Sequence, residues 1–243
     1  MGSSNQNVLI IGGSGGLGLE LTKLFLRNQD RVAVHFFKNK APVEAVLKYF
    51  DSQNNGLVCQ ADVQNEMSVH AMFDLLMRRW SHLDTVIYNA GVTEDVLLSK
   101  MTETQWDQVI QVNLTGLFYC MKHAFGWMRK NKRGHFITIA SRSGLTGRIG
   151  QANYSASKAG VIGLTRSAAK EWGPDQVQAN TVLPGFLPTA MGLKIEEKKR
   201  ARILRENVLQ KPSTLEEVGR FIFFLSRLNH VSGQVFNLDS RLV

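Results

Sequence analysis

Short apolar runs, rich in β-branched residues, alternate along the chain with longer segments whose apolar residues recur every three or four positions. The first pattern is typical of buried strands and the second of amphipathic helices. Strand-like runs occupy Val8–Ile11, Arg31–Phe36, Leu57–Gln60, Thr85–Tyr88, His135–Ala140, Gln178–Leu183 and Val235–Leu238. Helical patterns occupy Leu17–Arg27, Val43–Asp51, Val69–Trp80, Glu103–Arg129, Asn153–Trp172 and Leu215–Leu228.

This alternation predicts an α/β protein. A strand, a helix and a further strand form a right-handed crossover between parallel neighbours, and repeated crossovers cover both faces of the sheet. We therefore expect one doubly wound parallel sheet of about seven strands, with helices on both faces. No internal repeat or linker interrupts the 243 residues, which predicts a single domain over residues 1–243.

The composition is that of a globular protein, since 44% of the residues are hydrophobic and 20% are charged. No apolar run approaches the roughly 18 residues of a membrane span. No charged segment precedes the apolar run Val8–Ile11, as it would in a signal peptide, so we expect a cytoplasmic protein. Cys59 and Cys120 lack other metal-ligating residues at finger-like spacing, which predicts two buried, reduced thiols and no metal site.

The chain is basic, with a formal charge of +9 and a pI near 9.7. Much of this charge lies in Arg129–Arg133 and in residues 194–205. Such clusters are commonly solvated surface, but they also attract acidic partners or polyphosphate ligands. Neither a nucleic-acid motif nor an aromatic platform accompanies them, which argues against nucleic acid as the partner.

A glycine-rich turn follows the first predicted strand and opens the first predicted helix. It reads Gly12-Gly13-Ser14-Gly15-Gly16-Leu17-Gly18. Glycines in this place let the chain turn tightly and let its backbone approach a pyrophosphate at the helix N-terminus. Between a first strand and a helix, the motif indicates a dinucleotide-binding site.

Tyr154 and Lys158 are four residues apart in a predicted helix, so their side chains project from the same face. Tyrosine is a poor acid at neutral pH because its unperturbed pKa is about 10. A neighbouring ammonium favours the phenolate and makes the hydroxyl a usable proton donor. The pair also occurs on solvated helices, so its meaning depends on the rest of the chain.

Together these motifs resemble those of the short-chain dehydrogenase/reductase family. The resemblance is carried, in chain order, by the glycine turn, Asn89-Ala90-Gly91, Asn113, Ser141, Tyr154 and Lys158. Within that family the chain is most similar to 3-oxoacyl-(acyl-carrier-protein) reductases. The closer likeness lies in Asn89-Ala90-Gly91-Val92-Thr93, Gly150-Gln151-Ala152-Asn153-Tyr154 and Pro184-Gly185-Phe186. The resemblance covers nearly the whole chain and implies a Rossmann-type fold.

The resemblance implies catalytic roles for four residues. Tyr154 would protonate a ketone oxygen as hydride arrives, or deprotonate an alcohol in the reverse direction. Lys158 would lower the pKa of the tyrosine and bind the nicotinamide ribose. Ser141 would hydrogen-bond the ketone, and Asn113 would hold a water that links Lys158 to solvent.

The resemblance also implies which residues bind the cofactor. Asp62 would bind the adenine amino group with Val63 beside the ring, while Leu187 and Thr189 would contact the carboxamide of the nicotinamide. The full implied set is Gly12, Ser14, Gly15, Gly16, Leu17, Gly18, Lys38, Asp62, Val63, Asn89, Ala90, Gly91, Tyr154, Lys158, Pro184, Gly185, Leu187 and Thr189.

The residues after the second strand bear on the choice between NAD and NADP. An acidic residue there would bind the ribose 2′-hydroxyl of NAD, but the strand continues into Phe37-Lys38-Asn39-Lys40. Lys38 could pair with a 2′-phosphate, and Lys40 could do so if the loop folds inward. Against this, Gly15 stands where NADP-using relatives often carry a basic residue. The sequence favours NADP(H) over NAD(H).

Three places depart from the family pattern. Ile11 replaces a threonine whose hydroxyl buttresses the glycine turn, and Tyr88 replaces an asparagine ahead of Asn89. Leu238–Arg241 replaces a glycine pair in a region that commonly packs between subunits. The charged segment Ala190–Pro212 is expected to form a lid over the substrate, with a short amphipathic helix from Lys194 to Arg200.

The resemblance implies an NADPH-dependent reductase of a 3-oxoacyl thioester in fatty acid biosynthesis. An acidic acyl carrier protein would then meet the basic cluster Arg129–Arg133. Two alternatives are another secondary alcohol dehydrogenase or ketoreductase, acting on a small ketone, a secondary metabolite or a steroid, and a non-catalytic dinucleotide-binding protein. The family also implies a homo-oligomer, dimer or tetramer, through Glu103–Arg129 and Asn153–Trp172.

Overall fold

In the part of the chain that the structure describes, seven strands form one sheet in the order β3-β2-β1-β4-β5-β6-β7, and each neighbouring pair is parallel. The structure, a computed structural model, describes residues 5–52, 55–193 and 197–241. The strands are β1 Asn7–Ile11, β2 Arg31–Phe36, β3 Gly56–Gln60, β4 Thr85–Tyr88, β5 Gly134–Ile139, β6 Val177–Leu183 and β7 Val235–Asn237. This confirms the predicted doubly wound α/β fold.

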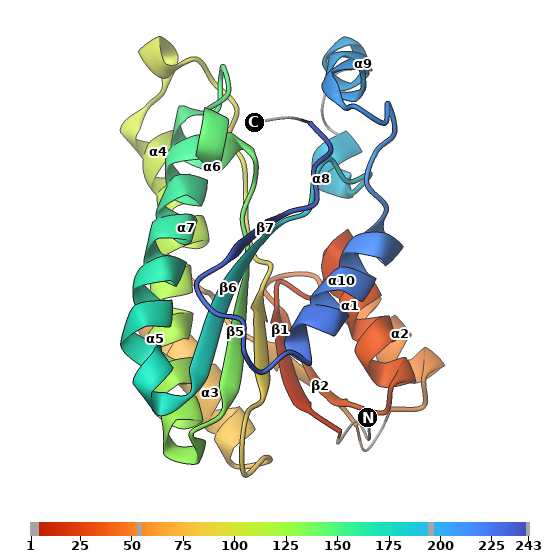
Figure 1. The fold of residues 1–243 in the computed structure, drawn as a ribbon, viewed down its shortest axis with the longest axis vertical. Coiled ribbons are helices and arrows are strands. Elements are labelled where there is room, and N and C mark those ends of the chain that lie inside the picture. The colour runs from red at the N-terminus through yellow and green to blue at the C-terminus, as the bar shows by residue number, and fades with distance from the viewer. Residues whose placement is uncertain (1–4, 53–54, 194–196, 242–243) are drawn as a thin grey trace.

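Ten α-helices connect or flank the strands in the described part of the chain. They are α1 Gly16–Arg27, α2 Ala41–Tyr49, α3 Glu66–Met77, α4 Glu103–Ile110, α5 Gly116–Met128, α6 Ser143–Thr146, α7 Ala152–Trp172, α8 Ala190–Leu193, α9 Glu197–Glu206 and α10 Leu215–Ser226. Helices α6, α8 and α9 lie beyond one end of the sheet, together with α4 (Figure 1). Residues 194–196 of the predicted lid helix lie outside the described residues.

Helices cover both faces of the sheet. Helices α1, α2 and α10 pack on one face, and α3, α5 and α7 pack on the other (Figure 1). Successive residues of β1 enter opposite cores: Val8 and Ile10 face the first set of helices, and Leu9 and Ile11 face the second. Because both faces are buried, the strands are continuous apolar runs rather than alternating ones.

The order of the strands reverses between β1 and β4. The chain moves outward from β1 to β2 and β3, and then returns to place β4 on the other side of β1. Connections on either side of this point leave toward opposite faces, so the carboxyl ends of β1 and β4 border the crevice where open α/β sheets bind ligands. The glycine turn follows β1, and Asn89 follows β4.

The predicted helix Glu103–Arg129 is helical throughout but is not one regular α-helix. A π-helical segment, Gln111–Thr115, separates α4 from α5. The hydroxyl of Tyr88 donates a 2.6 Å hydrogen bond to the carbonyl oxygen of Val112 within this segment. Short π-helical segments inside α-helices are frequent at functional sites, and this one contains Asn113.

The structure also bears on the state of the two cysteines and on the presence of membrane-spanning helices. Cys59 and Cys120 are both free and buried, and burial raises the pKa of the Cys59 thiol to about 12. Among the described residues, no helix is long and apolar enough to cross a membrane.

Candidate active site

The glycine turn is packed too tightly for side chains. Gly12 has a φ of +77°, and a Cβ atom on it would lie 2.6 Å from the backbone nitrogen of Ala90. A Cβ atom on Gly18 would lie 2.5 Å from the carbonyl oxygen of Gly12. These two positions therefore require glycine, because real Cβ contacts are never that short.

The turn presents the N-terminus of α1 to the carboxyl edge of the sheet. No side chain caps α1 from Gly15, and its first turn carries no acidic residue. Its first N–H groups and the positive end of the helix dipole are therefore available to an anion. These residues fit the pyrophosphate of a dinucleotide.

Side chains from the neighbouring strands hold the turn in place. The Asn89 side-chain amide donates a 3.0 Å hydrogen bond to the carbonyl oxygen of Gly12. His35 of β2 accepts from the N–H groups of both Gly12 and Gly13, through its ring and its carbonyl oxygen respectively. The contact of Asn89 fits the predicted placement, whereas the contact of His35 was not predicted.

Lys158 reaches the centre of the site from α7. Its side chain is buried, and its Nζ donates a 2.8 Å hydrogen bond to the carbonyl oxygen of Ile139 at the end of β5. The same Nζ lies 5.6 Å from the centre of the Tyr154 ring. Burial lowers the pKa of the Lys158 ammonium to about 8, because low-dielectric surroundings disfavour the charged form.

Tyr154 lies one turn earlier on α7, beside Ser141. Burial raises the pKa of the Tyr154 hydroxyl, and a hydrogen bond from Ser141 lowers it. The charge of Asp95 raises this pKa and that of Arg148 lowers it. In this structure, therefore, the resolved influences that favour the phenolate come from Ser141 and Arg148.

The Asn113 side chain ties the π-helical segment to the loop after β4. Its Oδ1 accepts from the N–H of Val92 at 2.8 Å, and its Nδ2 donates to the carbonyl oxygen of Val92 at 3.0 Å. The same Nδ2 lies 3.0 Å from Ser157 Oγ on α7. The amide group is thus occupied within the protein, and a predicted water relay would use other atoms of this residue.

The four predicted catalytic residues converge at one place. A Cβ atom on Gly91 would lie 3.3 Å from Asn113 Oδ1 and 3.6 Å from Lys158 Nζ. Ser141 bonds Tyr154, which completes the cluster on the other side of Lys158. The structure therefore brings a phenol, a hydroxyl and an ammonium together at the carboxyl edge, where a proton can be held and passed to a ligand.

The remaining predicted cofactor residues border the same edge. Thr189, in the loop after β6, lies over the glycine turn, since a Cβ atom on Gly16 would be 3.0 Å from its Cγ2. Asp62 follows β3, and its Oδ1 accepts a 3.0 Å hydrogen bond from the N–H of Gln64. The side chain of Leu17 lies in the core, so only its backbone can face a ligand. The loop after β6 also holds Pro184, Gly185 and Leu187.

The two predicted phosphate-binding lysines differ in their surroundings. Lys38 is exposed two residues after β2, with its Nζ 5.2 Å from the centre of the Phe37 ring. Lys40 pairs with Glu44 at 2.6 Å in the first turn of α2. Because Lys40 is already paired with a carboxylate, Lys38 is the better candidate to bind a 2′-phosphate.

Gln151 is a further site residue whose contacts the sequence did not reveal. It is buried just before α7, and its Nε2 lies 2.9 Å from both carboxylate oxygens of Asp95. An isolated parallel bridge joins Gln151 to Val96. These contacts fasten the loop after β4 over the start of α7, beside Tyr154.

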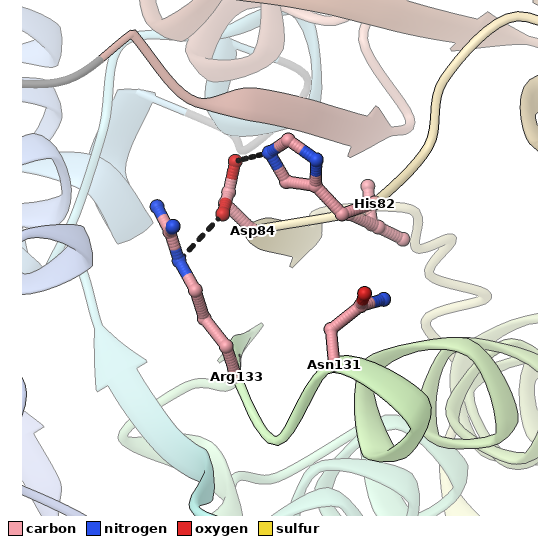
Figure 2. A pocket seen from close by; sticks show the side chains of 5 residues that line it. His82, Asp84, Asn131 and Arg133 are labelled. Atoms are coloured by element: carbon pink, nitrogen blue, oxygen red, sulfur yellow. Dashed lines mark ion pairs between the residues drawn. The ribbon is translucent and has the colours of Figure 1, made fainter.

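The basic cluster Arg129–Arg133 lies at the opposite edge of the sheet. It directly precedes β5, so it borders the amino ends of the strands, and β5 spans about 20 Å at about 3.3 Å per residue. There Arg133 Nε lies 2.8 Å from Asp84 Oδ1, and His82 Nε2 lies 3.2 Å from Asp84 Oδ2 (Figure 2). A partner bound to this cluster is thus separated from Tyr154 of the same chain by the length of the sheet.

Known proteins are similar to this chain in sequence and in fold. The family model described as short chain dehydrogenase matches residues 6–200. A 3-oxoacyl-[acyl-carrier-protein] reductase of Synechocystis sp. is 35% identical over 98% of this chain and 97% of its own length. The 3-oxoacyl-[acyl-carrier-protein] reductase FabG of Thermotoga maritima is 34% identical over 97% of this chain and 96% of its own length.

Solved structures of ElxO are similar over nearly the whole fold. ElxO with NADP bound has a TM-score of 0.89 and is 28% identical, and the match covers 98% of each chain. A tyrosine-to-phenylalanine variant of ElxO with NADPH bound has a TM-score of 0.88 at 29% identity, again over 98% of each chain.

Proposed function

Because the chain belongs to the short-chain dehydrogenase family and is an NAD(P)-dependent oxidoreductase of ketone and hydroxyl groups, we propose that it reduces a 3-oxoacyl thioester, carried on an acyl carrier protein, to the 3-hydroxyacyl thioester. The observation that carries this proposal is the name shared by relatives 34–35% identical over almost the whole chain. The convergence of Asn113, Ser141, Tyr154 and Lys158 at the carboxyl edge supports it.

Each member of this cluster has a chemical role in the proposed reaction. The nicotinamide cofactor, when bound, supplies the hydride. Tyr154 donates its proton to the ketone oxygen, and Ser141 holds that oxygen by a hydrogen bond. Lys158 stabilises the phenolate left on Tyr154 and binds the cofactor ribose. Asn113 places the π-helical segment so that a water chain can return a proton to Lys158.

The reductase proposal has a direct competitor within the same family. The site chemistry is equally able to serve a ketoreductase of a small ketone, a secondary metabolite or a steroid. A substrate panel followed by NADPH absorbance separates the two. The proposal requires acetoacetyl thioesters to be reduced more efficiently than cyclohexanone or a 3-ketosteroid.

We further propose NADPH as the physiological cofactor. The exposed Lys38 after β2 and the absence of a carboxylate between Phe37 and Lys40 support this choice, because a 2′-phosphate needs a cation and not an acid there. The NADP-bound structures of ElxO are consistent with it.

Replacing Lys38 with alanine is expected to weaken NADPH binding about tenfold, the size of one lost hydrogen bond to a charged group. Binding of NADH should change by less than twofold, and so should NADPH binding in the control Lys40→Ala. Fluorescence titration of both cofactors gives the dissociation constants. Tighter binding of NADH than of NADPH by the unaltered protein would rule out the cofactor assignment.

The domain organisation, the oligomeric state and the cellular location of the enzyme belong to the same proposal. We infer one domain in which the described residues 190–193 and 197–212, including α8 and α9, belong to the substrate lid. Trp106 of α4 and Phe118 of α5 are 37% and 47% exposed, which supports a homo-oligomer that pairs α4–α5 and α7 with a second copy. The two free thiols support a reducing, cytoplasmic environment.

The position of Arg129–Arg133 defines how a carrier would have to dock. Four cations in five residues make this the denser basic cluster, whereas α9 also contains Glu197 and Glu206. Because the cluster lies at the amino edge, a carrier bound there would deliver its thioester to the site of an adjacent copy. The oligomer is therefore part of the docking proposal.

Reversing the charge of Lys130 and Lys132 is expected to raise KM for the carrier-bound thioester about tenfold and to leave KM for a free thioester unchanged. Both side chains are exposed, and Arg133 is left intact because it pairs with the buried Asp84. The comparison variant is Lys198→Glu with Arg205→Glu on α9, the second basic cluster, which belongs to the proposed lid and should therefore change KM for both thioesters alike. A carrier-specific effect of the α9 variant alone, or equal effects of the Lys130 and Lys132 reversal on both substrates, would contradict docking at Arg129–Arg133.

A further inference from the structure

His35 is buried where three parts of the cofactor edge meet. It is the fifth residue of β2 and is 2% exposed. Its Nδ1 lies 3.0 Å from the backbone nitrogen of Gly12, and its Nε2 lies 3.0 Å from the carbonyl oxygen of Ala61 after β3. Its own carbonyl oxygen accepts from the N–H of Gly13 at 2.8 Å. One residue thus joins the glycine turn to the ends of β2 and β3.

These contacts define the protonation state of the ring. The N–H of Gly12 can only donate, so Nδ1 of His35 must carry a lone pair. The carbonyl oxygen of Ala61 can only accept, so Nε2 must carry the proton. The contacts therefore select one neutral tautomer. In the doubly protonated ring, Nδ1–H would face the N–H of Gly12 and the bond to the turn would be lost.

The side chain of the residue before the glycine turn cannot support the turn by a hydrogen bond, so the turn depends on the bond from His35. Ile11 is fully buried in the apolar core beneath α3 and α5. The carbonyl oxygen of Gly12 is held by Asn89, and the N–H of Gly12 is held by His35. The two side chains thus hold the two peptide groups on either side of the Gly12 Cα, just before α1.

We propose that His35 is a positioning residue for the dinucleotide, which holds the glycine turn in its binding conformation only while the imidazole is neutral. Without this bond the turn relaxes in the free protein and must be reordered on binding, which weakens affinity. The inference depends on dinucleotide binding but not on the proposed substrate, because its readout is cofactor affinity.

The charges around the ring set the direction of its titration. Burial lowers the pKa of His35, while the hydrogen bond with Ala61 and the carboxylate of Asp62 raise it, and the balance lies below its ordinary value. Cys59, the register partner of His35 on β3, is a neutral thiol at these pH values. The ring is therefore neutral at pH 7 and gains a proton only in acid, so cofactor affinity should fall on acidification.

The test compares His35→Leu, which removes the acceptor, with His35→Asn, whose Oδ1 can accept from the N–H of Gly12 without titrating. Isothermal titration calorimetry with NADP⁺ measures affinity from pH 8 to pH 5, and His230→Leu, at an exposed histidine, is the control. At pH 8, His35→Leu should weaken binding about tenfold and His35→Asn by less than threefold. KM for NADPH should rise in His35→Leu by more than kcat falls.

The pH profile gives the decisive readout. The affinity of the unaltered protein, divided by that of His35→Asn at each pH, should fall as the pH is lowered from 7 to 5. Taking this ratio cancels the titration of the cofactor phosphate itself. A ratio that stays constant with pH, or full affinity in a folded His35→Leu variant, would overturn the inference. Loss of binding in both variants would also contradict it, since His35→Asn retains the acceptor.

Discussion

Replacing Tyr154 with phenylalanine is expected to lower kcat about 10³-fold while NADPH binding changes by less than twofold. The change removes the proposed general acid, and general acids contribute about 10²- to 10⁴-fold to rate. It removes one hydroxyl and leaves the ring over Lys158 in place, so the cofactor edge is preserved.

Two measurements separate these effects: steady-state NADPH oxidation with an acetoacetyl thioester, and NADPH titration by fluorescence. Ser141→Ala is the companion variant and should lower kcat less, because it removes a hydrogen bond and not the acid. Turnover that persists in Tyr154→Phe would exclude this residue as the proton donor. It would also mean that another group in the site protonates the ketone oxygen.

Replacing Lys158 with methionine is expected to abolish turnover and, at pH 7, to make the cofactor-free protein more stable. The ammonium is buried, and burial lowers its pKa from 10.5 to about 8, which corresponds to a cost of about 3 kcal/mol for keeping it charged. The variant loses the hydrogen bond to Ile139, worth about 1 kcal/mol. The expected net gain in unfolding free energy is about 2 kcal/mol.

The cost of burying the Lys158 ammonium should make the unfolding free energy depend on pH in a defined direction. In the folded protein the pKa of Lys158 is below its unfolded value, so between about pH 8 and pH 10.5 the unfolded chain binds more protons and stability rises with pH. Below pH 8 the full cost remains. Urea unfolding from pH 7 to pH 10 should show this rise in the unaltered protein and in the exposed-lysine control Lys170→Met, but not in Lys158→Met. Parallel profiles for all three would show that burial of the Lys158 ammonium does not set the pH dependence of stability.

The sequence was sufficient for the parts of the fold that depend on local pattern. Both faces of the sheet are buried, so runs such as Val8–Ile11 could be recognised as strands from composition alone. The glycine turn was identifiable because Gly12 and Gly18 have no room for a Cβ atom. The spacing of Tyr154 and Lys158 was informative because an α-helix places such pairs on one face.

Other features depended on contacts between distant segments. The π-helical segment Gln111–Thr115 leaves the apolar pattern of its helix intact, so periodicity could not reveal it. His35 appears as one polar residue in an apolar strand, and only its distance to Gly12 shows what it does. The location of Arg129–Arg133 followed from strand direction, since a segment that precedes a parallel strand lies at the edge opposite the site.

NADPH oxidation with acetoacetyl substrates decides whether a 3-oxoacyl thioester is the substrate of this enzyme. The substrates are acetoacetyl-acyl carrier protein, a free acetoacetyl thioester and a simple ketone at matched concentrations. We expect one 3-hydroxyacyl thioester to form per NADPH consumed. We also expect a kcat/KM on the order of 10⁴ M⁻¹s⁻¹ or higher for the carrier-bound form and lower values for the other two. Reduction of the simple ketone with no turnover of either thioester would exclude a 3-oxoacyl thioester as the substrate.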